Sequence, residues 1–155
     1  MKVIRSEIFQ KYPEINFAFS IKIGLDRPAP YYFNLSLSVG DDEKNVKENR
    51  RVFFAELGLS EENIAIQKQT HSDAVRYVTK GGIVGEGDAM VTDKKNLGLV
   101  ISIADCTPIF IYDHKNKVIA AVHSGWRGTQ KQILAKTIEK LKNEFKKIQN
   151  ETKTR

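Results

Sequence analysis

The sequence contains 155 residues, of which 41% are apolar and 28% are charged. This length suits one globular domain with a hydrophobic core, and the composition excludes an intrinsically disordered chain. No apolar run approaches the ~18 residues of a membrane span, and the first residues lack a secretory signal pattern. Cys106 is the single cysteine, which excludes an internal disulfide framework and suits a reducing compartment. We therefore expect a cytoplasmic protein with no membrane partner.

The net charge of +6 comes entirely from the C-terminal region. Residues 1–126 contain 16 Lys and Arg and 16 Asp and Glu, whereas residues 127–155 contain nine basic and three acidic residues. A nucleic-acid-binding surface usually combines basic with aromatic side chains, and Phe145 is the only aromatic residue in this region. We therefore interpret the lysines as a solvated helix face and expect no nucleic-acid partner.

The predicted elements begin after a proline-containing loop at residues 26–31. Asp41 and Asp42 offer an N-cap for a helix that ends near Gly58. Short β-type runs follow, at Ile64–Ile66, Ala74–Val78, Ala89–Thr92, Leu97–Ala104, Ile109–Tyr112 and Val118–Val122.

The loop Asp113–Lys117 is short enough to predict a hairpin between the last two runs. A final helix is expected from about Thr129, because apolar residues then recur on one face: Ile133, Leu134, Ile138, Leu141, Phe145 and Ile148. Together these elements predict an α/β or α+β domain with a mixed, largely antiparallel sheet flanked by helices.

Three candidate ligands stand at the ends of predicted strands: His71, Cys106 and His123. Two imidazoles and a thiolate suit Zn²⁺ and leave a fourth position for water or substrate. The spacings of 35 and 17 residues are not those of a zinc finger. Taken singly, each residue has a structural alternative, as a buried thiol or a hydrogen-bonded histidine. His114 lies in the hairpin loop, and we expect it to be exposed.

The sequence around these residues resembles the laccase-domain family. Four blocks carry the resemblance in the right order: Gln69–Asp73, Gly87–Thr92, Ala104–Pro108 and Ala121–Gly128. Upstream, Phe33–Ser36, Gly40–Asp41 and Asn49–Arg50 also match the family pattern. The family was long named for multicopper polyphenol oxidases and is now described as purine nucleoside phosphorylases with adenosine deaminase activity. The resemblance implies a metal site on His71, Cys106 and His123, usually zinc. It also implies the α/β cysteine-hydrolase fold of a bacterial deamidating toxin.

Two departures from the family pattern are visible. The family's Thr-Arg-x-Gly-Gly stretch is replaced by Ile21–Leu25, in which Lys22 keeps the charge but not the bidentate fork of arginine. Family members also continue past the helix that follows Trp126, with further strands and an arginine. We therefore expect residues 1–155 to form a single laccase-like domain that lacks the family's C-terminal part.

The first functional hypothesis is a zinc-dependent purine nucleoside phosphorylase, with purine nucleoside and phosphate as its partners. The nucleosides would be adenosine, inosine, guanosine and methylthioadenosine, with deamination of adenosine as a second activity. The same site is expected to accept copper, which outcompetes zinc for nitrogen and sulfur ligands. The sequence leaves the oligomeric state open.

Several further residues are candidates for this chemistry. The turn at Gly125–Thr129 leads into a helix, so Arg127 is a candidate phosphate ligand; the alternative is a simple strand-to-helix turn. Trp126 would stack on the base or cover the core. Asp105 would act as an acid or base, or serve as a cap or ion pair. Asn34 and Arg50 are candidate substrate ligands.

Two other hypotheses use the same residues. A metal-free hydrolase would employ Cys106 as nucleophile, with His71 or His123 as base. A copper-dependent polyphenol oxidase (laccase) would need on the order of ten histidines for its coupled copper sites. The chain contains three histidines, which argues against this second alternative.

Overall fold

The computed structural model describes the backbone of residues 2–152 and the side chains of residues 2–145. Ile148, expected in the apolar stripe of the last helix, lies outside the described side chains. The chain divides into two compact units, with the boundary between Glu61 and Glu62. The expected single laccase-like domain over residues 1–155 stays a prediction.

The N-terminal unit contains a small antiparallel pair of strands, β1 (Val3–Ile4) and β2 (Phe19–Ser20), and a 3-10 turn, η1 (Phe9–Lys11). Its main element is the helix α1 (Glu43–Ala55), which buries Val46, Phe53 and Phe54. The side chain of Asp42 caps this helix, because its Oδ1 accepts a hydrogen bond from the Lys44 amide at 2.8 Å. The predicted helix and its N-cap are therefore confirmed.

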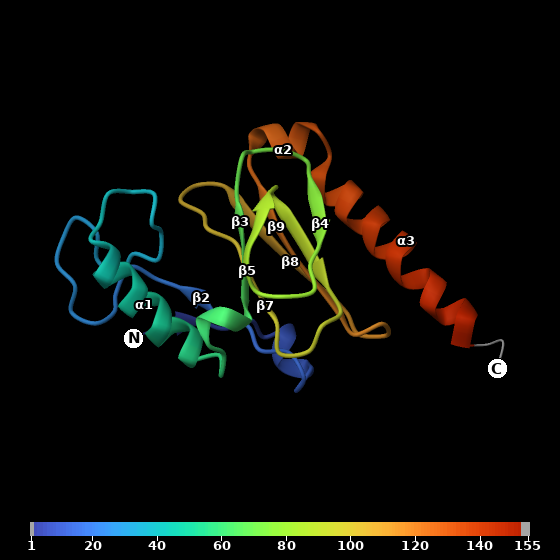
Figure 1. Cartoon of the computed structure of the whole chain (residues 1–155), viewed down its shortest axis with the longest axis horizontal. Coiled ribbons are helices and arrows are strands. Elements are labelled where there is room, and N and C mark those ends of the chain that lie inside the picture. Colours follow the sequence, from blue (N-terminus) through green and yellow to red (C-terminus); the bar gives the residue numbers. More distant parts are fainter. Residues whose placement is uncertain (1, 153–155) are drawn as a thin grey trace. The chain divides into compact units, whose positions relative to one another are not determined.

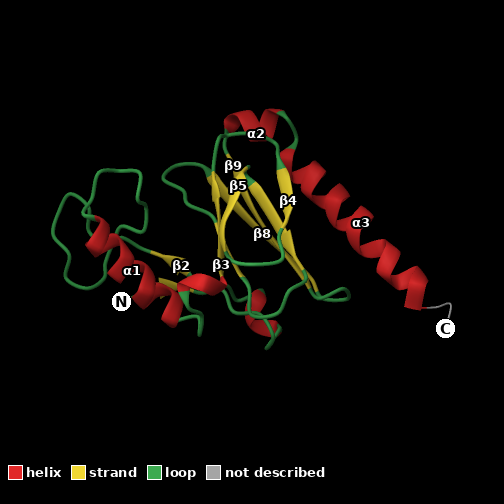
Figure 2. Cartoon of the chain, in the orientation of Figure 1, coloured by secondary structure: helices red, strands yellow, loops and turns green. Residues whose placement is uncertain are grey.

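The C-terminal unit is built on two sheets (Figures 1 and 2). The first has the order β5-β3-β7, formed by β3 (Ile64–Lys68), β5 (Gly82–Glu86) and β7 (Gly98–Val100), and both of its pairings are parallel. The second has the order β4-β6-β9-β8, formed by β4 (Val75–Tyr77), β6 (Ala89–Thr92), β8 (Thr107–Asp113) and β9 (Val118–Ser124). A 3-10 turn, η2 (Glu61–Asn63), leads into β3.

The mixed α/β class is confirmed, but the expected antiparallel character holds only for part of the structure. β9 pairs antiparallel with β6 and β8, and the β8–β9 hairpin is the predicted one. β4 pairs in parallel with β6, and β5 and β7 both pair in parallel with β3. The run at Leu97–Ala104 is shorter than expected, because only Gly98–Val100 forms a strand and an irregular loop follows.

Strand β6 lies at the centre of the core, and all four of its residues are buried. Because side chains alternate along a strand, Val91 packs with Leu141 and Phe145 of the helix α3 (Ile133–Thr152), whereas Met90 packs with Ala65 of β3. The second sheet is therefore covered by α3 on one face and by the first sheet on the other.

The expected final helix is split in two. The short helix α2 (Trp126–Gln130) comes first, and Gln132, with a φ of 61°, separates it from α3. A left-handed residue cannot continue an α-helix, so the chain turns there before α3 packs on the sheet. None of the helices in the described part of the chain combines the length and apolar character that a bilayer crossing needs.

Candidate functional site

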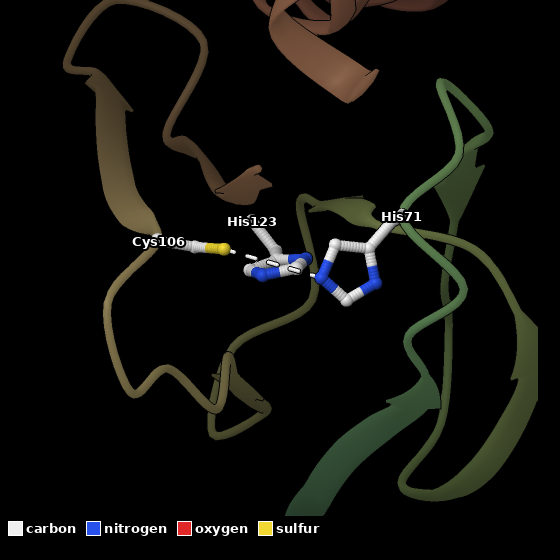
Figure 3. A group of neighbouring side chains, drawn as sticks. All are labelled: His71, Cys106 and His123. Carbon is white, nitrogen blue, oxygen red and sulfur yellow. Dashed lines mark hydrogen bonds between the residues drawn. The ribbon is translucent and has the colours of Figure 1, made fainter. Parts of the chain in front are cut away.

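The structure brings His71, Cys106 and His123 together (Figure 3). One ligand atom from each lies within 4.8 Å of the others. Sγ of Cys106 is 4.0 Å from Nε2 of His71, and the two imidazole rings meet edge to face with centroids 4.9 Å apart. Segments 35 and 17 residues apart in the sequence thus present three metal-ligating side chains to one point.

Of the three side chains expected at strand ends, only that of His123 lies at the end of a strand, because β7 already ends at Val100, well before Cys106. His123 is buried near the end of β9, opposite Pro108 of β8. Cys106 directly precedes β8 and is half-buried. His71 is exposed in the loop between β3 and β4, and its φ of 55° places it in the left-handed region. The site is therefore open on the side of His71 and rigid on the side of His123.

A side-chain amide connects the loops that carry His71 and Cys106. Gln69 donates from Nε2 to the carbonyl of Ser102 at 2.8 Å, and its Oε1 accepts from the Ser102 amide at 2.8 Å. The two hydrogen bonds satisfy both backbone groups of Ser102, in a loop that has no sheet partner. This pairing holds the approach to Cys106 against the segment that leads into His71.

Asp88, which directly precedes β6, lies under the cluster with no exposed surface. Its Oδ1 is 2.7 Å from Nδ1 of His123 and accepts from the His71 amide at 3.1 Å. Its Oδ2 accepts from the Ser72 amide at 2.6 Å, the Ser72 hydroxyl at 2.7 Å and the Thr70 amide at 3.2 Å. Burial raises the pKa of Asp88, but the hydrogen bonds from His123 and Ser72 outweigh it and hold the pKa below its usual value.

The charge around Cys106 disfavours its thiolate in the metal-free protein. Partial burial raises the pKa of the thiol, and the neighbouring Asp105 raises it further through its charge and by accepting a hydrogen bond from Sγ at 3.7 Å. Asp105 itself is exposed. A cation bound at the cluster would reverse this balance, because a coordinating thiol loses its proton.

Gly125 provides the space in which the three side chains meet. A Cβ at this position would lie 2.9 Å from Cδ2 of His71 and 3.2 Å from Sγ of Cys106. Its φ of −73° and ψ of 169° are accessible to any residue, so the requirement for glycine is one of volume.

The remaining candidates of this unit lie just after His123. Trp126 is 70% exposed at the start of α2, so it does not cover the core. The guanidinium carbon of Arg127 is 5.2 Å from the Trp126 ring centroid. Among the described side chains, Arg127 forms no ion pair with a carboxylate. The expected helix at this turn has five residues, so its dipole is a weaker anion-binding feature than the sequence indicated.

Asn34 and Arg50 belong to the N-terminal unit. Asn34 donates from Nδ2 to the Ser36 carbonyl at 2.8 Å and to Asp41 at 3.0 Å. Arg50 donates from Nε to the Leu35 carbonyl at 2.8 Å. Both side chains brace the loop before α1, and their role as substrate ligands stays a prediction. His114 is exposed in the β8–β9 turn and is not part of the cluster.

Three residues of the site were not singled out from the sequence: Gln69, Asp88 and Gly125. All three stand inside blocks that carry the family resemblance (Gln69–Asp73, Gly87–Thr92 and Ala121–Gly128), which is a signal for Gly125 and also for Gln69 and Asp88. The partners of Gln69 and Asp88, however, are 33 and 35 residues away, so spacing along the chain does not reveal them.

The donor set fits a thiophilic divalent metal. A thiol and two imidazoles are the ligands that zinc and copper share, and Gly125 leaves the space between them free. Nδ1 of His123 contacts a carboxylate, the usual outer partner of a metal-bound histidine. The cluster could therefore bind a metal through all three residues.

Comparisons with known proteins place the chain in a family. The model of the family described as "Multi-copper polyphenol oxidoreductase laccase" matches residues 17–154. The chain belongs to this laccase-domain family. Curated relatives include a purine nucleoside phosphorylase of Clostridium acetobutylicum, 40% identical over 114 residues, which are 73% of this chain and 44% of the relative. Another, of Corynebacterium glutamicum, is 37% identical over 128 residues, which are 79% of this chain and 52% of the relative.

Solved structures give the same result for the fold. The crystal structure of the hypothetical protein YfiH of Bacillus licheniformis has a TM-score of 0.76 at 28% identity, covering 80% of this chain and 51% of that one. The structure of YlmD of Geobacillus stearothermophilus has a TM-score of 0.75 at 28% identity, covering 78% of this chain and 49% of that one. The chain thus spans about half the length of the laccase-domain relatives that it matches.

Replacing Gly125 with alanine is expected to weaken zinc binding by about tenfold or more, because the added methyl group would displace His71 or Cys106. The backbone conformation tolerates alanine, so the fold should be retained. Competition for zinc with a chromophoric chelator measures the effect. Ser124→Ala, at the neighbouring position, is the control and should bind zinc like the wild type. A Gly125→Ala variant that also binds zinc as tightly as the wild type would show that the space at Gly125 is not needed.

Asp105→Asn is expected to lower the pKa of Cys106, because it removes the negative charge that disfavours the thiolate. A lower pKa means a larger thiolate fraction at neutral pH, so the metal-free variant should react faster with iodoacetamide there, and the two rates should converge at high pH. Mass spectrometry reports the reaction directly, because Cys106 is the single cysteine. Superimposable rate–pH curves would contradict this account of the site's electrostatics.

Proposed function

We propose that this chain carries the catalytic site of a zinc-dependent purine nucleoside phosphorylase that also deaminates adenosine. The substrates are purine nucleosides (adenosine, inosine, guanosine and methylthioadenosine) and inorganic phosphate. The observation that carries the proposal is the convergence of His71, Cys106 and His123 in a chain about 40% identical to a curated purine nucleoside phosphorylase.

The proposed roles follow from the chemistry of each side chain. His71, Cys106 and His123 hold the metal, which supplies Lewis acidity beside the substrate when bound. The exposed indole of Trp126 offers a face on which a purine stacks. Asp105 is proposed as the acid or base that exchanges a proton with substrate or water, which its exposure beside Cys106 supports. Asn34 and Arg50 are proposed as substrate ligands on the match to the family pattern.

Arg127 is proposed as the phosphate ligand. In phosphorolysis a phosphate oxygen forms a bond to C1′ of the ribose, while the bond from C1′ to the purine nitrogen breaks and the purine takes up a proton. An anion in this position needs a fixed cationic partner. The guanidinium of Arg127 has no carboxylate partner among the described side chains, and it can donate two parallel hydrogen bonds to phosphate.

One alternative is favoured by a specific observation. The 4.0 Å contact of Cys106 with Nε2 of His71 suits a metal-free hydrolase with Cys106 as nucleophile. The raised pKa of the thiol argues against it, because the thiolate is the nucleophile. A copper-dependent polyphenol oxidase with several coupled coppers lacks ligands, because the chain has three histidines and His114 stands outside the cluster.

The proposal is tested by metal analysis of the purified chain together with incubation of adenosine with and without phosphate. We expect about one zinc per chain, phosphate-dependent release of adenine and phosphate-independent formation of inosine. Cys106→Ala removes the only thiol ligand and is expected to lose both the zinc and both activities, at a cost to stability of about 1 kcal/mol. A metal-free chain that hydrolyses an amide or ester would support the alternative, and a zinc-retaining, active Cys106→Ala variant would refute the assignment of Cys106.

Arg127→Lys is expected to raise the phosphate concentration needed for half-maximal phosphorolysis about tenfold, because lysine cannot form the paired hydrogen bonds. Deamination should change much less, because water replaces phosphate as the attacking group. Arg76→Lys, at an exposed arginine of β4 in the same unit, is the matched control. A parallel loss of both activities with an unchanged phosphate dependence would show that Arg127 only braces the turn.

A further inference from the structure

We propose that Asp88 is a positioning residue that fixes the proton of His123 on Nδ1 and orients the loop of His71, so that Nε2 of His123 presents a free lone pair to the cluster. The benefit of this arrangement for metal binding rests on the proposed function. The geometry itself concerns the metal-free protein alone.

The hydrogen bonds of Asp88 determine which atom of His123 carries the proton. Three of the groups that contact its carboxylate are the backbone amides of Thr70, His71 and Ser72, and an amide N–H can only donate. The carboxylate is therefore an acceptor on both oxygens. Nδ1 of His123, 2.7 Å from Oδ1, is consequently the donor in its own contact. In the neutral imidazole, the proton on Nδ1 leaves Nε2 unprotonated.

The same carboxylate controls the backbone of the His71 loop. His71 has a φ of 55°, in the left-handed region that residues with a Cβ adopt less readily than glycine. The amides on either side of this residue, together with its own, all point at Asp88. One buried group thereby fixes the His71 backbone and the His123 ring at the same time.

The backbone of Asp88 adds a second connection to His123. The Asp88 carbonyl accepts from the His123 amide at 2.7 Å, and the Asp88 amide donates to the Ala74 carbonyl at 3.1 Å. The carboxylate is thus presented from a strand start that is itself bonded to β9 and to the end of the His71 loop. Little freedom remains for Asp88 to move away from the imidazole.

Asp88→Asn distinguishes this role from a purely structural one, because asparagine offers one acceptor oxygen and one NH₂ donor. The side of Oδ2 receives two backbone amides and the hydroxyls of Ser72 and Thr70, whereas the side of Oδ1 receives one backbone amide and His123. The amide oxygen is expected on the first side, so the NH₂ group faces Nδ1 of His123. The imidazole must then accept at Nδ1 and carry its proton on Nε2, which removes the lone pair from the cluster.

The test is long-range ¹H–¹⁵N NMR of the histidine rings in metal-free protein at mildly alkaline pH, with His71→Gln and His114→Gln variants to assign the signals. We expect the wild-type His123 to be protonated on Nδ1 and the Asp88→Asn variant to be protonated on Nε2. Zinc affinity, measured by chelator competition, should fall by about 10- to 100-fold in Asp88→Asn. Asp93→Asn is the matched control: Asp93 directly follows β6, where it accepts from the Tyr77 hydroxyl at 2.7 Å, and it should leave both readings unchanged.

A wild-type His123 with its proton on Nε2 would overturn the proposal, whether or not Asp88→Asn folds. A folded Asp88→Asn variant with the wild-type tautomer and zinc affinity would overturn it as well. Because the NMR reading needs neither metal nor nucleoside, an Nδ1-protonated His123 in a chain without phosphorylase activity would refute the proposed function and leave the role of Asp88 standing.

Discussion

The Asp88 carboxylate lies out of reach of water, so the protein itself must supply its hydrogen-bond donors. Those donors come from the 70–72 segment and from β9. Among the described residues, no other side chain forms hydrogen bonds with both of these segments. An unpaired buried charge would cost several kcal/mol, so the loop and the strand cannot separate without a large penalty. The convergence of the two histidines is a direct consequence.

The core supports this arrangement from below. Every residue of β6 is buried because α3 covers one face and β3 the other, so the strand that begins beside Asp88 is held on both sides. The ion pair of Lys136 with Asp73 attaches α3 to the segment just after His71. The side chain of His71 is exposed, but its backbone is therefore held by Asp88 and by the ion pair of the neighbouring Asp73 with α3.

Local chemistry made part of this structure predictable from the sequence. Asp42 beside the apolar spacing of Val46 and Phe53 marks α1, and the polar turn at Asp113–Lys117 marks the β8–β9 hairpin. These signals act within one element or one turn. His71, Cys106 and His123 could be named because their side-chain chemistry is rare in this chain and their sequence blocks resemble those of a known family.

Other features have no local signature. β5 is absent from the predicted strands, because Gly82 and Gly85 have positive φ and the apolar Ile83 is exposed; in the structure it pairs in parallel with β3. Gln132 ends a helical pattern that its neighbours would continue, because packing on the sheet requires a turn there. The hydrogen bond between Asp88 and His123 spans 35 residues and depends on parallel and antiparallel pairings that no local sequence pattern indicates.

The pairing of Gln69 with Ser102 has a kinetic consequence. The side chain of Gln69 forms with the Ser102 backbone the two hydrogen bonds that a neighbouring strand could form. It thereby joins the loop that carries His71 to the loop that carries Cys106. Opening one loop requires the other to lose its partner as well, so the two form one cooperative unit of local unfolding. If the cluster holds a metal through all three side chains, its release would require the joint opening of both loops rather than the motion of a single side chain.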